Sequence, residues 1–193
     1  MLRVGSDCSG MCTELHALDA LGIPYEHVFC SETWEPAIRY TRANHRAKRM
    51  YRDVTERALE DAPVVDLYVC GFPCQPVSGM NQKKRVHDPR REPMWCAVEY
   101  IKAKRPKYWV LENVTGLMQT IASQAGVTLN NAQLFDRLME EVGLSRVDFI
   151  KLDFGCGEAA SCKLNHTGYP SAIDSLRRVG EGIAAVALHQ MLL

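Results

Sequence analysis

The chain has 193 residues, 47% of them hydrophobic and 24% charged, which is enough to bury the core of a single domain. Its 23 basic and 23 acidic residues cancel, so net charge gives no indication of a nucleic-acid partner. No apolar stretch approaches the roughly 20 residues of a membrane helix, and no secretory signal is visible, so we expect an intracellular protein with reduced cysteines.

Strand-like and helix-like patterns alternate through the first 152 residues. The predicted elements are, in chain order, a strand at 2–6, a helix at 14–21, strands at 27–31 and 51–54 separated by a helix at 36–45, a strand at 64–70, a helix at 94–103, a strand at 108–111, a helix at 134–142 and a strand at 147–152. This alternation predicts an α/β fold, a doubly wound and mostly parallel sheet with helices on both faces.

The C-terminal 40 residues depart from this alternation. They begin with turn-forming residues, and residues 173–193 are predicted to be helical without a tie to the preceding pattern. We therefore divide the chain into an α/β domain at residues 1–153 and an atypical tail at residues 154–193.

The first candidate site is the turn of small residues between the first strand and the first helix. It consists of Asp7, Cys8, Ser9, Gly10 and Met11. Backbone amides and a helix N-terminus can approach a polar ligand there. Glu32 follows the next strand, where doubly wound folds place a carboxylate that binds ribose hydroxyls. Trp34 can stack on an adenine, although a solvated carboxylate and a packed tryptophan are the alternatives.

The second candidate is Cys74, which a turn presents after the strand at 64–70. The rigid Pro73 and the polar Gln75 beside it favour a presented thiol over a buried cysteine, which is the commoner state. Such a thiol needs a nearby cation or helix N-terminus to become strongly nucleophilic. Cys74 is therefore a candidate nucleophile.

The third and fourth candidates are an acidic and a basic segment. Glu112 and Asn113 follow the strand at 108–111 at the same sheet edge, where a partly buried carboxyl group can share or donate a proton. A basic run at residues 83–85 begins nine residues after Cys74, where a loop could close over a polyanion. The alternatives are an ordinary loop and a solvated face.

Together these motifs resemble the cytosine-5 DNA methyltransferases over about residues 3–152. This resemblance implies a Rossmann-like fold, S-adenosyl-L-methionine as cofactor, DNA as substrate and no metal. The cofactor residues that it implies are Asp7, Cys8, Ser9, Gly10, Met11, Glu32, Thr33, Trp34, Asp53, Val54, Phe72 and Pro73. The substrate residues that it implies are Gln75, Ser78, Lys83, Lys84, Arg85 and Asn113.

The resemblance also implies a mechanism. The Cys74 thiolate would attack C6 of cytosine, and Glu112 would hold a proton at N3. The base would have to leave the duplex, with the loop after Gln75 covering it. The compartment would be the nucleus in a eukaryote and the cytoplasm in a bacterium.

The chain departs from the family pattern in three places. Cys12 replaces a common glycine, where a side chain could crowd the turn against the cofactor. No Gln-x-Arg-x-Arg strand follows Glu112, and the target-recognition region is absent, as a truncation, an alternative C-terminus or a frameshift would explain. A catalytically inactive fragment and a relative that methylates tRNA are therefore the alternative interpretations.

Overall fold

The computed structural model describes residues 1–76 and 88–113 together with short pieces of the remaining chain. These pieces are residue 117, residues 120–122, 128–130, 136–137, 140–141 and 143, and residues 151–152 and 186–190.

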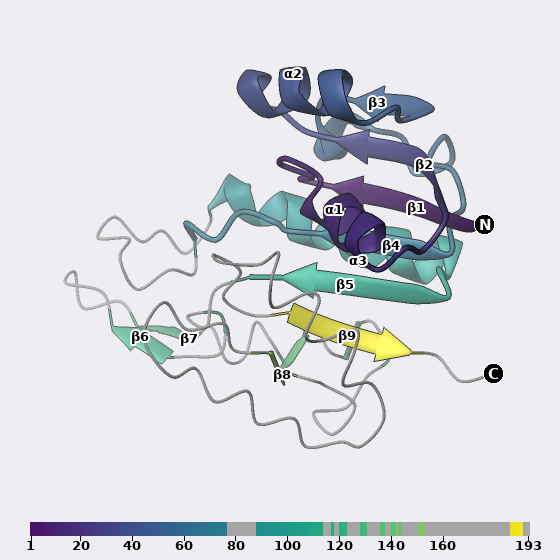
Figure 1. The fold of residues 1–193 in the computed structure, drawn as a ribbon. Coiled ribbons are helices and arrows are strands. Elements are labelled where there is room, and N and C mark those ends of the chain that lie inside the picture. Colours follow the sequence, from purple (N-terminus) through teal and green to yellow (C-terminus); the bar gives the residue numbers. More distant parts are fainter. Residues whose placement is uncertain are drawn as a thin grey trace, which may run out of the picture.

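A seven-stranded sheet in the order β3-β2-β1-β4-β5-β9-β8 forms the centre of the described chain (Figure 1). The first five strands in sequence are β1 (Leu2–Asp7), β2 (Tyr25–Ser31), β3 (Arg49–Tyr51), β4 (Leu67–Cys70) and β5 (Tyr108–Glu112). They pair in parallel. β9 (Val186–Gln190) is antiparallel to both β5 and β8 (Lys151–Leu152), while β6 (Thr120–Ala122) and β7 (Thr128–Asn130) form a separate antiparallel pair.

Helices cover both faces of the sheet, as a doubly wound fold requires. α1 (Thr13–Ala20) lies in front of the sheet in Figure 1, α3 (Glu92–Lys104) lies behind it, and α2 (Glu35–Asn44) lies beside β3. Leu15 of α1 packs with Val4 of β1, and α3 packs in the cluster that contains Tyr68 and Trp109. The predicted fold class is confirmed.

Two predicted strands are wrong in their bounds. The third strand is Arg49–Tyr51 instead of 51–54, because the Asp53 carboxylate accepts the Thr55 N–H at 2.8 Å and starts a 3₁₀ turn, η1 (Val54–Glu56). A second 3₁₀ turn, η2 (Pro89–Arg91), precedes α3.

The strand predicted at 64–70 is β4, which begins at Leu67. Val64 is half exposed and lies outside the ladder with β1.

The prediction of a helix at residues 173–193 is wrong where the structure describes that segment. Residues 186–190 form β9, which pairs along the whole of β5. Alanine and leucine in this segment favour a helix locally, but β5 offers a row of unpaired backbone groups that a strand satisfies. Of the strand predicted at 147–152, residues 151–152 form β8 and the others lie outside the described residues.

The strand order places a topological switch point at the carboxyl ends of β1 and β4. The chain leaves β1 toward β2 and β3 and then crosses back to β4 and β5, so its direction reverses between these two neighbours. Ligands of open α/β sheets bind at such a switch point. None of the described helices is long and apolar enough to cross a membrane.

Candidate functional site

A tight loop at residues 8–12, called the 8–12 loop, joins β1 to α1 at the switch point. Cys8, Gly10 and Cys12 have positive φ angles of 50°, 51° and 55°, which fold the backbone back on itself. The Ser9 N–H donates to the Ser31 carbonyl at 3.0 Å, and the Gly10 N–H donates to the Glu32 carboxylate at 2.7 Å. The loop is therefore fastened to the end of β2.

Glu32 is fixed by its other oxygen as well. Oε1 accepts the backbone N–H groups of Thr33 and Trp34, each at 2.8 Å. Trp34 is 59% exposed. A held carboxylate beside an exposed indole matches the ribose-and-adenine pattern that the sequence predicts.

Cys12 does not crowd the outer side of the 8–12 loop, contrary to expectation. Its side chain is fully buried and packs with Val4 and Leu15 between β1 and α1. Its sulfur lies 3.5 Å from Thr41 Oγ1. The side chain that replaces the family's glycine is accommodated in the core.

Asp7, a predicted cofactor residue, is fully buried at the end of β1. Its carboxylate accepts hydrogen bonds from Ser31 Oγ at 2.7 Å, Arg57 Nη1 at 2.8 Å, Arg57 Nη2 at 2.7 Å and Tyr68 OH at 2.7 Å. A carboxylate offers about four lone-pair sites, so the protein itself occupies all of them. A direct contact of Asp7 with the cofactor stays a prediction.

Arg57 lies in a cage of aromatic rings. Its guanidinium carbon lies 4.9 Å from the ring centre of Phe29, 5.1 Å from that of Tyr51 and 5.6 Å from that of Tyr100. Burial lowers the pKa of Arg57, but the adjacent Asp7 carboxylate more than offsets this and leaves the pKa raised. Arg57 therefore keeps its positive charge inside the core.

Asp53 caps the N-terminus of η1 and Val54 is its first residue. The Asp53 carboxylate accepts both the N–H and the hydroxyl of Thr55, at 2.8 and 2.7 Å, and the Val54 side chain is buried. The predicted adenine-contacting segment therefore has a fixed conformation.

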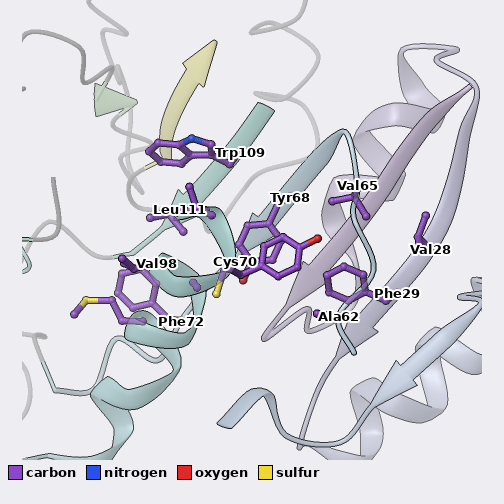
Figure 2. Packing of buried hydrophobic residues seen from close by; sticks show 14 of the residues in the cluster. Val28, Phe29, Ala62, Val65, Tyr68, Cys70, Phe72, Val98, Trp109 and Leu111 are labelled. Carbon is purple, nitrogen blue, oxygen red and sulfur yellow. The ribbon is translucent and has the colours of Figure 1, made fainter. Parts of the chain in front are cut away.

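The turn that carries Cys74 is tied to the end of β5. Phe72 is buried in the main hydrophobic cluster, close to Val98 (Figure 2), and its carbonyl accepts the Asn113 side-chain N–H at 2.8 Å. Cys74 is partly exposed and Gln75 exposed, which agrees with a presented thiol. Asn113, predicted to bind substrate, holds this turn in place.

Gly71 marks the point where three strand ends meet. A Cβ atom on Gly71 would lie 3.3 Å from Glu112 Oε2 and 3.9 Å from the Cys8 carbonyl oxygen. The Glu112 carboxylate, the 8–12 loop and the Cys74 turn are therefore neighbours. Ser78 and the basic run at residues 83–85 lie outside the described residues.

Two other cysteines, Cys70 of β4 and Cys96 of α3, have raised pKa values. Hydrogen bonding with Cys8 and burial raise the pKa of the Cys70 thiol well above its ordinary value. Burial raises the pKa of Cys96 to about 11. Both thiols are therefore protonated at neutral pH and unreactive. Within the described ranges no three His, Cys, Asp or Glu side chains are grouped as metal ligands.

Sequence reasoning missed Arg57 and Tyr68. A charged residue is rarely buried, so Arg57 is expected on the surface, and Tyr68 reads as an ordinary core residue of a strand. The available signal was Asp7 itself, because a carboxylate at the inner end of a buried strand requires a cationic or hydrogen-bonding partner.

A family model described as C-5 cytosine-specific DNA methylase matches residues 4–137. The orphan methyltransferase M.Rho11sI of Bacillus phage rho11s is 37% identical over 131 residues, which cover 67% of this chain and 25% of that protein. The type II methyltransferase M.NgoBV of Neisseria gonorrhoeae is 34% identical over 93 residues, which cover 48% of this chain and 22% of that protein. The chain thus spans about a quarter of the length of these relatives.

Solved structures share the fold. The Dnmt2 methyltransferase of S. pombe superimposes with a TM-score of 0.55 at 22% identity, over 79% of this chain and 44% of that one. A mutant of DNMT2 from Spodoptera frugiperda gives a TM-score of 0.52 at 18% identity, over 79% and 43% of the two chains.

Proposed function

The chain belongs to the C-5 cytosine-specific DNA methylase family, and from this premise we propose that its switch-point edge transfers a methyl group from S-adenosyl-L-methionine to C5 of cytosine in DNA. The observation that carries the proposal is the junction at Gly71. Glu112 and the 8–12 loop both lie against this glycine, three residues before Cys74. A proton carrier, a ligand loop and a nucleophile are thus joined in one place.

The residues present fit the cofactor. The fixed Glu32 carboxylate would accept hydrogen bonds from the ribose hydroxyls, and the exposed Trp34 would stack on the adenine. Asp53 and Val54 would lie along the adenine edge. S-adenosyl-L-methionine would supply an electrophilic methyl group to this edge of the sheet.

Cys74 would act as the nucleophile. Its thiolate adds to C6 of cytosine, a Sγ–C6 bond forms, and the electron pair of the C5–C6 bond moves to C5. C5 would take the methyl group as the S–CH₃ bond breaks, which leaves S-adenosylhomocysteine, and C5 would then lose its proton to a base while the Sγ–C6 bond breaks. The expelled thiolate and the aromatic ring are both restored.

Glu112 would hold a proton at N3 of the base. This proton neutralises the charge that develops on the ring when Cys74 adds, and it favours cytosine because uracil already carries hydrogen on N3. Asn113 would hold Glu112 and Cys74 in a fixed arrangement through its hydrogen bond to the Phe72 carbonyl.

A second candidate is a cofactor-binding chain without turnover. The departure from the family pattern after Glu112 favours it, because residues 113–193 contain no Gln-x-Arg-x-Arg segment of the kind that the resemblance assigns to holding the target base. In this candidate the cofactor residues still bind the cofactor, but no substrate is bound at the Cys74 turn.

The test is transfer of a labelled methyl group. The whole chain is incubated with methyl-labelled cofactor and either duplex DNA or tRNA, and nucleosides are analysed for labelled 5-methylcytosine. We expect label in DNA, none with Cys74→Ser, and about 10²–10⁴-fold less with Glu112→Gln. Cys96→Ser, on α3, is the matched control and should keep full activity.

Each other outcome contradicts part of the proposal. Label that survives Cys74→Ser rules out this nucleophile. Label in tRNA alone makes RNA the substrate. Cofactor binding without label in either nucleic acid favours the second candidate.

A further inference from the structure

Asp7 and Arg57 form a buried ion pair that no catalytic step uses. The Arg57 side chain is 3% exposed and the Asp7 side chain 0%, and their closest oxygen and nitrogen are 2.7 Å apart. Removing two charges from water costs free energy that is recovered only with full hydrogen bonding. Such a pair calls for a role beyond general stability.

The four hydrogen bonds of the Asp7 carboxylate come from three other segments of the site. Ser31 precedes Glu32 at the end of β2, and Arg57 directly follows η1, the turn that Asp53 caps. Tyr68 lies on β4, six residues before Cys74. Asp7 itself leads directly into the 8–12 loop.

One carboxylate therefore joins every described segment that is assigned to the cofactor or to the nucleophile. We propose that the Asp7–Arg57 pair is a positioning device, which sets the 8–12 loop against Glu32, η1 and the Cys74 turn and thereby prepares the cofactor site before ligand arrives. This inference rests on the proposed function, and it assigns Asp7 and Arg57 as positioning residues, which act through the segments that they hold.

The aromatic cage explains how the pair keeps one geometry. Phe29, Tyr51 and Tyr100 surround the guanidinium and leave it a single direction in which to present two parallel N–H groups. Lysine would keep the charge but lose this planar fork. Arg57→Lys should accordingly hold the 8–12 loop less firmly than the native arginine does, but more firmly than a variant without the positive charge.

The test compares backbone hydrogen exchange and ligand binding. Arg57→Met leaves a buried, unpaired carboxylate and is prone to misfolding, so the double variant Asp7→Asn/Arg57→Met, which removes both charges, is the decisive one. We expect the amides of Ser9, Gly10 and Cys12 in the ligand-free double variant to exchange at least tenfold faster, relative to α3, than in the native chain. The dissociation constant for S-adenosylhomocysteine should rise at least tenfold.

A matched tyrosine pair separates positioning from packing. Tyr68→Phe removes one hydrogen bond to Asp7, whereas Tyr100→Phe removes a hydroxyl that donates to the Pro63 carbonyl at 2.5 Å. The two rings stack with centroids 4.3 Å apart in the same cluster. Only Tyr68→Phe should accelerate exchange in the 8–12 loop and weaken binding of S-adenosylhomocysteine.

The remaining outcomes are decisive as well. The inference would be overturned if the 8–12 loop of the folded double variant exchanged its amide hydrogens at the native rate, or if exchange in α3 accelerated equally. The pair would then have a purely structural role. A native chain that binds no S-adenosylhomocysteine would overturn the proposed function, while the exchange comparison would still decide whether the pair positions the loop.

Discussion

Cys12 adopts a backbone conformation that glycine adopts more easily, with φ 55° and ψ 50°. We expect Cys12→Gly to be more stable than Cys12→Ala by about 1 kcal/mol, because both lose the thiol but only glycine is free of left-handed strain. Urea unfolding of the two variants measures the difference. An alanine variant of equal or higher stability would contradict this account of the loop.

Gly5 lies where the ring of Phe29 leaves no room for a methyl group. A Cβ there would lie 2.2 Å from Phe29 Cε1, well inside van der Waals contact. Gly5→Ala should lower the free energy of unfolding by about 1–3 kcal/mol through overpacking. The destabilisation caused by Gly5→Ala should be smaller by at least about 1 kcal/mol in a Phe29→Leu background, since the two positions are in contact. Equal costs in both backgrounds would refute the contact.

At the scale of elements, α3 ends in a strained residue. Arg105 caps this helix with φ 47° and ψ 58°, and its N–H donates to the Ile101 carbonyl at 2.9 Å. Its side chain is exposed, so Arg105→Gly should raise stability by about 0.5–1 kcal/mol relative to Arg105→Ala. Thermal unfolding of the two variants tests this, and an identical Tm would show that the cap is not strained.

The elements that sequence predicts well are those whose pattern is local. β1, β2, β5 and the three long helices follow from apolar periodicity and from glycine or proline at their ends. β9 was missed because its residues favour a helix and its partner β5 lies more than 70 residues earlier. Pairing over such a separation leaves no trace in local propensity.

At the scale of the whole molecule, stability should fall on acidification through two buried histidines at the opposite end of the sheet. His27 and His45 line a cavity of about 540 Å³ there. Burial, and then the nearby His45, lower the pKa of His27 from 6.5 to about 4. Burial, and then His16, lower that of His45.

The folded state therefore binds fewer protons than the unfolded chain between about pH 6.5 and 4, and stability is lost as pH falls through this window. His27 alone should account for about 2 kcal/mol between about pH 7.5 and 5. Urea unfolding of the native chain and His27→Gln at both pH values measures this. A variant that loses as much stability as the native chain would contradict the assignment.

The sequence indicates the site residues that are polar and stand at the ends of apolar strands. It does not indicate the hydrogen bonds that join the segments of the site. Cys74, Glu112 and Glu32 follow from polar residues at strand ends, which parallel topology brings to one edge. The hydrogen bond from Asn113 to Phe72 and the pairing of Asp7 with Arg57 depend on contacts between residues 41 and 50 positions apart. No local pattern encodes such contacts.

The most direct test of the central claim is covalent capture at Cys74. The chain is incubated with S-adenosyl-L-methionine and duplex DNA carrying 5-fluorocytosine, whose fluorine blocks the elimination that would release the enzyme. Intact mass and peptide mapping should then show the chain joined to the methylated oligonucleotide through Cys74 Sγ, and no such species with Cys74→Ser. An adduct at another residue, or none while S-adenosyl-L-methionine is bound, would contradict the account.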